Sequence, residues 1–234
     1  MKLFLITGAG QGLGRQLARD FDQEEVHLLL FGRTFEKLAK TRSEISHAMV
    51  DIIDVDLVQY EEVLQKLDRF DFSIYEEVVL INNAATWTGG VSIKEITPQT
   101  MREAFDLNFM SAFNITKATL ELSSPNTKIK ILNIGATASK RGGANMAAFA
   151  IPKASLRIFT ECLARELGRE KVHACHVIVD GLLNNERTRS ISSNLMDHEF
   201  IQQESLSSTL RHLINQNESC WTLELDVRPY CEKF

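Results

Sequence analysis

The stretch LFLITGAGQGLGRQLA, residues 3–18, decides the fold. Its apolar start predicts a strand, and its amphipathic end predicts a helix. Between them Gly8, Gly12 and Gly14 take the spacing G-x-x-x-G-x-G. Glycines let the backbone turn tightly and approach a phosphate, while the N-terminus of the helix offers free N–H groups and the positive end of its dipole. The stretch therefore predicts a dinucleotide-binding strand–turn–helix unit, with a plain turn that binds nothing as the alternative.

Short apolar runs alternate with amphipathic stretches along the rest of the chain. The predicted strands are Lys2–Thr7, Val26–Phe31, Met49–Ile53, Val78–Asn82, Lys128–Ile134, His173–Val179 and Thr222–Val227. The predicted helices are Leu13–Phe21, Phe35–Ser43, Gln59–Phe70, Pro98–Leu122, Met146–Gly168 and roughly His198–Ile214. Strands that alternate with helices form βαβ units, which right-handed crossovers join into a parallel sheet. We therefore predict a single Rossmann-like α/β domain over residues 1–234, doubly wound, with about seven parallel strands and helices on both faces.

Composition excludes several classes of partner. A net charge of −5 offers no basic field to nucleic acid. No stretch approaches the roughly 20 apolar residues of a membrane span, and glycines interrupt the N-terminal apolar run too early for a signal peptide. Neither the four cysteines nor the six histidines show metal-ligand spacing, so no metal site is predicted. The cysteine pattern favours reduced thiols in a cytoplasmic protein.

The residues after the second predicted strand distinguish between the two nicotinamide cofactors. The sequence LLLFGRT, residues 28–34, places Arg33 and Thr34 there and has no Asp or Glu. An acidic side chain at this point would bind the ribose 2′-hydroxyl of NAD, whereas arginine accepts the 2′-phosphate of NADP. We therefore expect NADP(H) in preference to NAD(H), and the alternative for Arg33 is a solvated charge at a helix start.

Further motifs occur in an order that is typical of one family. They are Asp56–Leu57, NNAA at 82–85, DLNFMSAF at 106–113, KILNIGA at 130–136, FAIPK at 149–153, VDG at 179–181 and ELDVRPY at 224–230. With TGAGQGLG at 7–14, they make the chain resemble the short-chain dehydrogenase/reductase family over nearly its full length. The resemblance implies an oxidoreductase that transfers hydride between a nicotinamide cofactor and a small-molecule substrate.

The resemblance also implies which residues hold the cofactor. Those of the glycine turn and the second strand are Gly8, Gly10, Gln11, Gly12, Leu13, Gly14, Arg33 and Thr34. Asp56 would bind the adenine amino group with Leu57 beside it. The residues at the end of the fourth strand, beside the adenosine ribose, are Asn83, Ala84 and Ala85. Lys153 would bind the nicotinamide ribose, and the remaining cofactor residues are Asp180, Gly181 and Leu183, the first two of which stand where the family commonly has Pro-Gly.

Both hydroxyls of the family's usual active site are absent. The family has a serine after the fifth strand and a tyrosine thirteen residues later; the same spacing here gives Ala136 and Phe149, followed by Lys153. Asn108 matches the family's asparagine, which helps to hold a proton-relay water. A lysine cation lowers the pKa of the family's tyrosine from about 10, so that the phenol can exchange a proton with the substrate. Without positioned acid–base catalysis we expect a loss of about 10²–10⁴-fold in rate.

Other groups are candidates to replace the missing hydroxyls. Thr137 follows Ala136 and could polarise a carbonyl oxygen, Ser139 is out of register, and Tyr230 could reach the site of a neighbouring subunit. Three functions therefore stay open. The first is an active NADP(H)-dependent oxidoreductase for a carbonyl, imine or enone that uses a non-standard proton route. The second is a catalytically degenerate, NADP(H)-binding regulatory or scaffold protein, and the third is a non-redox enzyme that uses Lys153.

The sequence also indicates a lid and an assembly. Residues 182–208 are expected to cover the substrate, because the polar stretch 184–197 has no regular pattern. Asn185 stands near the family's threonine that meets the nicotinamide carboxamide, and Asn can make the same contacts. The predicted helices Pro98–Leu122 and Met146–Gly168 carry apolar residues beyond one stripe, and the family usually pairs through them. We expect a homodimer or homotetramer.

Overall fold

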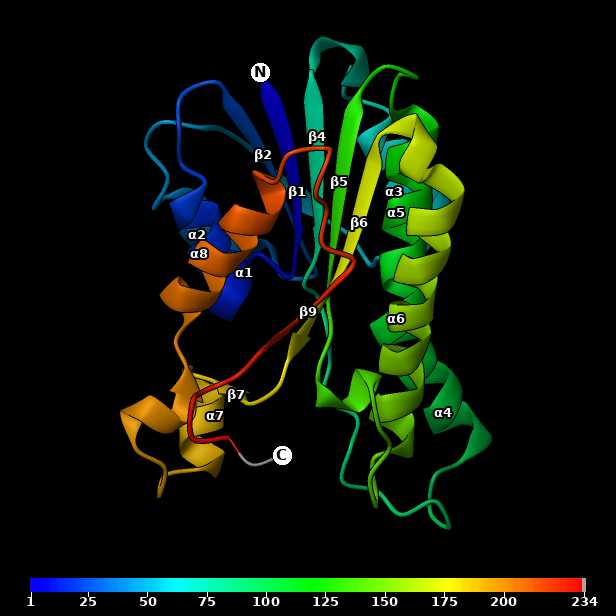
Figure 1. The fold of residues 1–234 in the computed structure, drawn as a ribbon, viewed down its shortest axis with the longest axis vertical. Coiled ribbons are helices and arrows are strands. Elements are labelled where there is room, and N and C mark those ends of the chain that lie inside the picture. Colours follow the sequence, from blue (N-terminus) through cyan, green and yellow to red (C-terminus); the bar gives the residue numbers. More distant parts are fainter. Residues whose placement is uncertain (233–234) are drawn as a thin grey trace.

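Seven parallel strands form the central sheet of the computed structural model, which describes residues 1–232 (Figure 1). Their order is β3-β2-β1-β4-β5-β6-β9. The strands are β1 (Lys2–Thr7), β2 (Val26–Gly32), β3 (Met49–Asp54), β4 (Glu77–Asn82), β5 (Lys128–Ile134), β6 (Val172–Val179) and β9 (Glu224–Val227). The predicted single-domain, doubly wound sheet is confirmed. The strand order reverses between β1 and β4, where a crevice opens at the carboxyl ends of the strands.

Helices cover both faces of this sheet (Figure 1). One face carries α1 (Gly12–Asp20), α2 (Phe35–Arg42) and α8 (Gln203–Ile214), and the other carries α3 (Tyr60–Leu67), α4 (Pro98–Phe105), α5 (Ser111–Leu122) and α6 (Ala147–Leu167). Successive side chains of a strand point to opposite faces. In β1, Phe4 and Ile6 belong to the core under the first group, and Leu3 and Leu5 to the core under the second. Burial on both faces explains why the strands read as continuous apolar runs.

The helix predicted over 98–122 contains a change of pitch. A π-helical turn, Asp106–Met110, separates α4 from α5. Such a turn has one residue more than an α-helical turn and is frequent at functional sites. Its one fully buried residue is Asn108.

The largest differences from the sequence prediction lie between residues 182 and 203. The helix predicted from about His198 begins only at Gln203, because Phe200–Ile201 form a short strand, β8, that pairs with β7 (Leu182–Leu183). The stretch predicted as an irregular loop contains a helix, α7 (Glu186–Ile191). This helix is too short to show a period in sequence. The lid candidate is therefore a folded excursion that two short strands close at its base.

Residues 1–232 contain no candidate membrane-spanning helix, metal site or disulfide. In residues 1–232 no helix combines the length and the apolar character that crossing a bilayer requires. Within the same range no cluster of His, Cys, Asp or Glu has the arrangement of a metal site, and all four cysteines are free thiols.

Candidate active site

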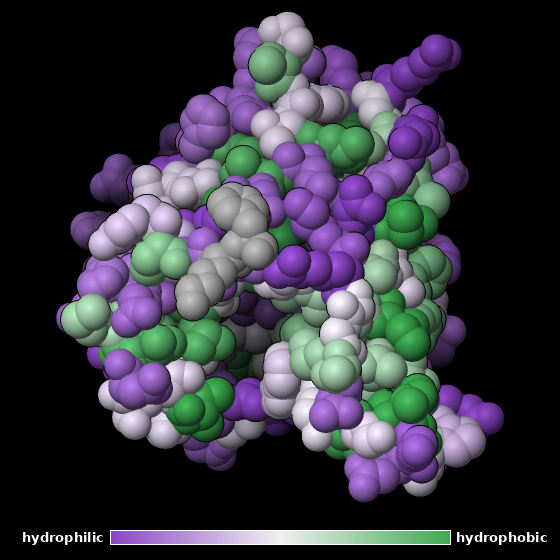
Figure 2. All heavy atoms as spheres, turned by 60° about the horizontal axis from the view of Figure 1, so that its bottom comes forward, coloured by the Kyte–Doolittle hydropathy of each residue, from purple (hydrophilic) through white to green (hydrophobic). Residues whose placement is uncertain are grey.

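A hollow opens at the carboxyl ends of the central strands. Figure 2 shows it from below, between the part of the molecule that carries α7 and the part that carries the ends of α4 and α6. In a doubly wound sheet, ligands bind in this crevice. The glycine turn, the NNAA segment, Asn108, Lys153 and Asp180 all lie at this edge, in the loops and helix starts that follow β1, β4, β5 and β6.

Backbone contacts require the glycines of the turn. Gly8 and Gly12 have φ of +67° and +55°, in the left-handed region that favours glycine. Gly14 has no room for a side chain, because a Cβ there would lie 2.3 Å from the carbonyl oxygen of Gly8. The start of α1 therefore packs directly on the end of β1, and its N–H groups face the crevice edge, as phosphate binding requires.

Two side chains that the sequence analysis did not single out hold this turn in place. Arg15 donates to the carbonyl of Gly10 at 2.5 Å and to the Thr41 hydroxyl at 3.1 Å. Thr41, on α2, in turn donates to the carbonyl of Ala9 at 2.9 Å. Because α2 and the turn are distant in sequence, no local pattern reveals this bracing. It fixes the turn before any ligand arrives.

The residues expected to select the cofactor lie beyond the end of β2. Arg33 and Thr34 are exposed, and within residues 1–232 the Arg33 guanidinium has no hydrogen-bond or ion-pair partner. Lys37, on the first turn of α2, reaches back to the Gln11 side chain at 3.2 Å. On the next strand end, Asp56 is half-buried and its carboxylate accepts the N–H of Val58 at 3.2 Å. Two cationic side chains therefore lie near the glycine turn: Arg33, which was predicted, and Lys37, which was not.

Thr7 organises the end of the central strand. Its hydroxyl oxygen accepts the N–H groups of Asn83 and Ala84, both at 2.9 Å. The Asn83 amide returns a bond to the carbonyl of Thr7 at 2.9 Å. The segment after β4 is thereby held against the glycine turn, and a Cβ on Gly8 would come within 3.0 Å of Ala84.

Both polar atoms of the Asn108 side chain bond to the protein backbone. Its side-chain oxygen accepts the N–H of Thr86 at 2.9 Å, and its amide donates to the carbonyl of Ala104 at 3.0 Å. The residue is 1% exposed. Asn108 therefore fixes the loop after β4 to the π-helical turn.

Lys153 is buried in the site with its charge barely satisfied. The side chain is on α6, 4% exposed, and its Nζ donates to the carbonyl of Ile134 at 2.8 Å. Burial lowers the pKa of Lys153 from 10.5 to about 8. Nζ also lies 6.0 Å from the centre of the Phe149 ring. One residue earlier, Pro152 cannot donate to the carbonyl of Ala148, which instead accepts the Thr88 hydroxyl at 2.9 Å.

The lowered pKa of Lys153 should make the free energy of unfolding depend on pH. Between about pH 8 and 10.5 the unfolded chain holds a proton that the folded chain has released, so the free energy of unfolding rises with pH in this window. The penalty of the buried charge is present in full below pH 8 and relieved above 10.5. Relative to Lys153→Met, the wild type should gain about 3 kcal/mol across the window. Denaturant titrations of both proteins measure this difference, and parallel pH profiles would contradict it.

Ala136 and Phe149 present no proton to the crevice. The N–H of Ala136 donates to the Ser139 hydroxyl oxygen at 3.1 Å, and the Phe149 ring packs on Trp87 with ring centres 4.9 Å apart. Thr137, the sequence candidate for a substitute, donates its hydroxyl proton to Asp180. Asp180 also pairs with Arg228 at 3.0 Å. The structure therefore brings Thr137 and Asp180 together, which the sequence analysis did not foresee.

The nicotinamide end of the predicted set lies beside the lid. Gly181 has a φ of +150°, and a Cβ there would come 2.9 Å from the Pro229 ring. Leu183 pairs in β7. The side-chain oxygen of Asn185 caps α7 by accepting the N–H of Thr188 at 3.0 Å. The exposed Tyr230 stacks on His198, with ring centres 5.8 Å apart.

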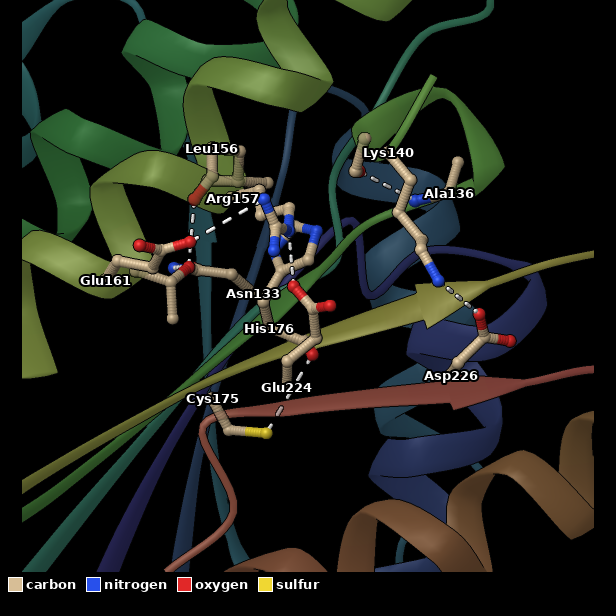
Figure 3. A network of polar contacts seen from close by, with 12 residues as sticks. Asn133, Ala136, Lys140, Leu156, Arg157, Glu161, Cys175, His176, Glu224 and Asp226 are labelled. Carbon is tan, nitrogen blue, oxygen red and sulfur yellow. Dashed lines mark hydrogen bonds and ion pairs between the residues drawn. The ribbon is translucent and has the colours of Figure 1, made fainter.

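A buried histidine lies directly behind Ala136. Figure 3 shows His176 on β6 beside Arg157, which bonds to Glu224 of β9. His176 is 1% exposed and neither ring nitrogen has a hydrogen-bond partner in the described chain. Burial, with Lys153 and Arg157 nearby, lowers the pKa of His176 to about 3, so the ring is neutral. A Cβ on Gly135 would lie 2.2 Å from Nε2 of this ring.

His176 therefore makes glycine necessary at position 135. We expect Gly135→Ala to lower the free energy of unfolding by about 1–3 kcal/mol, because the ring must move within a packed interior. In the background His176→Ala, the same change should cost less than half as much. Thermal melts of the four proteins in this cycle measure the coupling. Equal costs in both backgrounds would show that the ring is not the obstacle.

A glycine turn between β1 and α1, a crevice at the strand-order reversal and a buried lysine at its rim define a Rossmann-like, nucleotide-binding α/β protein. The model of the short chain dehydrogenase family matches residues 2–195, and the chain belongs to that family.

Individual relatives agree with this assignment. L-xylulose reductase of Caenorhabditis elegans is 30% identical over 174 residues, which are 73% of this chain and 68% of the relative. A short-chain dehydrogenase structure from Rhodopseudomonas palustris is 26% identical with a TM-score of 0.81, and the match covers 98% of this chain and 99% of that one. The closed form of a serine dehydrogenase complexed with NADP+ shares the fold at 18% identity, with a TM-score of 0.85 and coverage of 99% and 96%.

Proposed function

We propose that this protein binds NADP(H) and transfers hydride to or from a carbonyl, imine or enone, without a proton from positions 136 and 149. The observation that carries the proposal is a braced cofactor cradle beside a site that lacks both hydroxyls. Gly14 leaves room only for backbone, Lys153 is buried at the rim, and Ala136 and Phe149 stand where we place the family's serine and tyrosine.

The residues present fit a phosphorylated dinucleotide. The glycine turn and the start of α1 would hold the pyrophosphate, and Asp56 the adenine amino group. Arg33 has no protein partner in the described chain, and Lys37 lies next to the turn, so both are available to a 2′-phosphate. At the other end Lys153 would hold the nicotinamide ribose. The structurally similar serine dehydrogenase is complexed with NADP+, which supports a nicotinamide cofactor for this fold.

Removal of Arg33 tests the cofactor. We expect Arg33→Ala to weaken NADPH binding by about tenfold, because an arginine–phosphate contact is charge-assisted and bidentate. NADH binding should change less than twofold. Titration calorimetry of both cofactors measures the two affinities. The matched control is Arg42→Ala, which removes an equal charge from the last turn of α2, the helix that follows Arg33. Unchanged NADPH affinity, or an equal loss for NADH, would contradict the assignment.

A second candidate is a regulatory or scaffold protein that binds NADP(H) without turnover. The paired absence of hydroxyls at Ala136 and Phe149 favours it, as does Asn108, whose side chain serves backbone groups of this chain. NADPH binding with no turnover of any carbonyl, imine or enone in a broad panel would select this candidate. Turnover of one substrate would reject it.

We also propose an oligomer interface, a substrate lid and a cellular compartment for this protein. Phe109 of the π-helical turn meets the Phe159 ring of α6 edge-on, and Phe113 of α5 packs against that ring at a tilt. Ile158, the residue before Phe159, is about half exposed. We place the interface of a homodimer or homotetramer on this face, which sedimentation equilibrium tests. We assign residues 182–208 as the substrate lid. The four free thiols agree with a reducing compartment, and we assign the cytoplasm.

A further inference from the structure

Three polar side chains around Ala136 and Phe149 each bond to another group of the protein. The Thr137 hydroxyl donates a hydrogen bond to Asp180, which also forms an ion pair with Arg228. Lys153 donates to the carbonyl of Ile134 beneath the Phe149 ring. Ser139, which accepts the N–H of Ala136, is buried. A neutral carbonyl must gain a proton as the hydride arrives, and Ala136 and Phe149, at the positions of the family's serine and tyrosine, cannot supply one.

In place of the two hydroxyls the site has an aromatic wall. Trp87, in the loop after β4, is 49% exposed and packs on Phe149 with the ring planes at 47°. The loop is held to α6 by the bond from Thr88 to Ala148. Gly89 leaves the space for this packing, because a Cβ there would lie 2.8 Å from the Trp87 ring and 2.9 Å from the Met146 sulfur. Indole and phenyl faces attract cations, and indole does so most strongly.

We infer that the hydride acceptor is a cationic C=N group, an iminium ion, whose charge lies against Trp87. The inference rests on the proposed function and narrows its substrate class. The iminium carbon gains hydride, with its bonding pair, from a reduced nicotinamide, which becomes a pyridinium. The π pair of the C=N bond becomes the lone pair on nitrogen. The product is a neutral amine, which is tertiary where the iminium nitrogen carries no hydrogen, and the step requires no proton, so the absence of hydroxyls at positions 136 and 149 costs it nothing.

A binding experiment tests the cation preference without turnover. The protein loaded with NADPH is titrated calorimetrically with N,N-dimethyl-tetrahydroisoquinolinium, a charged probe that cannot be reduced, and with gem-dimethyltetralin, in which carbon replaces nitrogen. We expect the cation to bind about tenfold more tightly. Trp87→Leu should remove this preference and Trp87→Phe should keep part of it, while binding of the neutral probe changes less than twofold in both. Equal affinities, or a preference that survives in Trp87→Leu, would overturn the inference.

A turnover experiment separates this inference from the proposed function. N-methyl-dihydroisoquinolinium and α-tetralone have the same two-ring frame, one with a permanent iminium and one with a neutral carbonyl. Reduction of the iminium at least about a hundredfold faster than the ketone supports both statements. Comparable reduction of the two leaves the oxidoreductase proposal intact and overturns the iminium inference. Reduction of neither, with NADPH bound, overturns the iminium inference, and the broad panel of carbonyls, imines and enones then decides between the oxidoreductase and the regulatory candidate.

Discussion

The double substitution Ala136→Ser and Phe149→Tyr should raise NADPH-dependent reduction of neutral ketones by about 10²-fold or more, the amount that positioned acid–base catalysis contributes. A tyrosine ring can occupy the volume of Phe149, where the Lys153 ammonium lies 6.0 Å from the ring centre. That cation favours the phenolate and lowers the pKa of the new phenol toward neutrality. The new serine would polarise the carbonyl oxygen from the other position. Initial rates with α-tetralone and other neutral ketones measure the gain.

The single variants are the controls for this result. Groups that act as one unit are strongly non-additive, so each single change should give much less than its share of the gain. Reduction of the permanent iminium should not rise in parallel, because that step needs no proton. A double variant that binds NADPH yet reduces no ketone would show that the pocket around Trp87 has diverged as well, so that returning the two hydroxyls does not suffice.

Local sequence pattern predicted the sheet well for a physical reason. The strands β1 and β5 have the predicted bounds because β1 is an apolar run, β5 begins with alternating polar and apolar residues, and a glycine follows each strand. The region after β6 was predicted poorly, because β7 and β8 are two residues each and α7 is six. Elements this short carry less than two turns or one alternation of side chains, which leaves no period to detect.

The candidate site likewise has a part that local sequence predicts and a part that it does not. Gly8, Gly12 and Gly14 could be assigned because their spacing is local, and Phe149 because a fixed interval ties it to Ala136. The remaining contacts join segments that are far apart in the chain. Trp87 packs on Phe149, Thr137 bonds to Asp180 and His176 excludes a side chain from Gly135. Such contacts depend on how the loops after β4, β5 and β6 meet, which no local pattern encodes.

The glycine turn should prove least tolerant of change at Gly14. A Cβ at this residue would lie 2.3 Å from the carbonyl oxygen of Gly8 and 2.9 Å from the Cα of Ala9. Both obstacles are backbone, held by the bonds of Thr41 to Ala9 and of Arg15 to Gly10. No side-chain rotation can relieve the overlap, so α1 must move away from β1. We expect Gly14→Ala to lower the free energy of unfolding by about 3 kcal/mol or more, at or above the usual cost of overpacking.

Gly14→Ala should also weaken cofactor binding, because displacement of α1 carries its N–H groups away from the pyrophosphate. We expect NADPH affinity to drop by at least about tenfold in calorimetry, and the melting temperature by roughly 6–12 °C. The matched control is Gly142→Ala, since a Cβ there meets nothing within 4 Å. The control should leave both quantities within error. A Gly14→Ala protein with wild-type stability and affinity would mean that the helix start does not pack on the strand end, and the cofactor assignment would lose its structural basis.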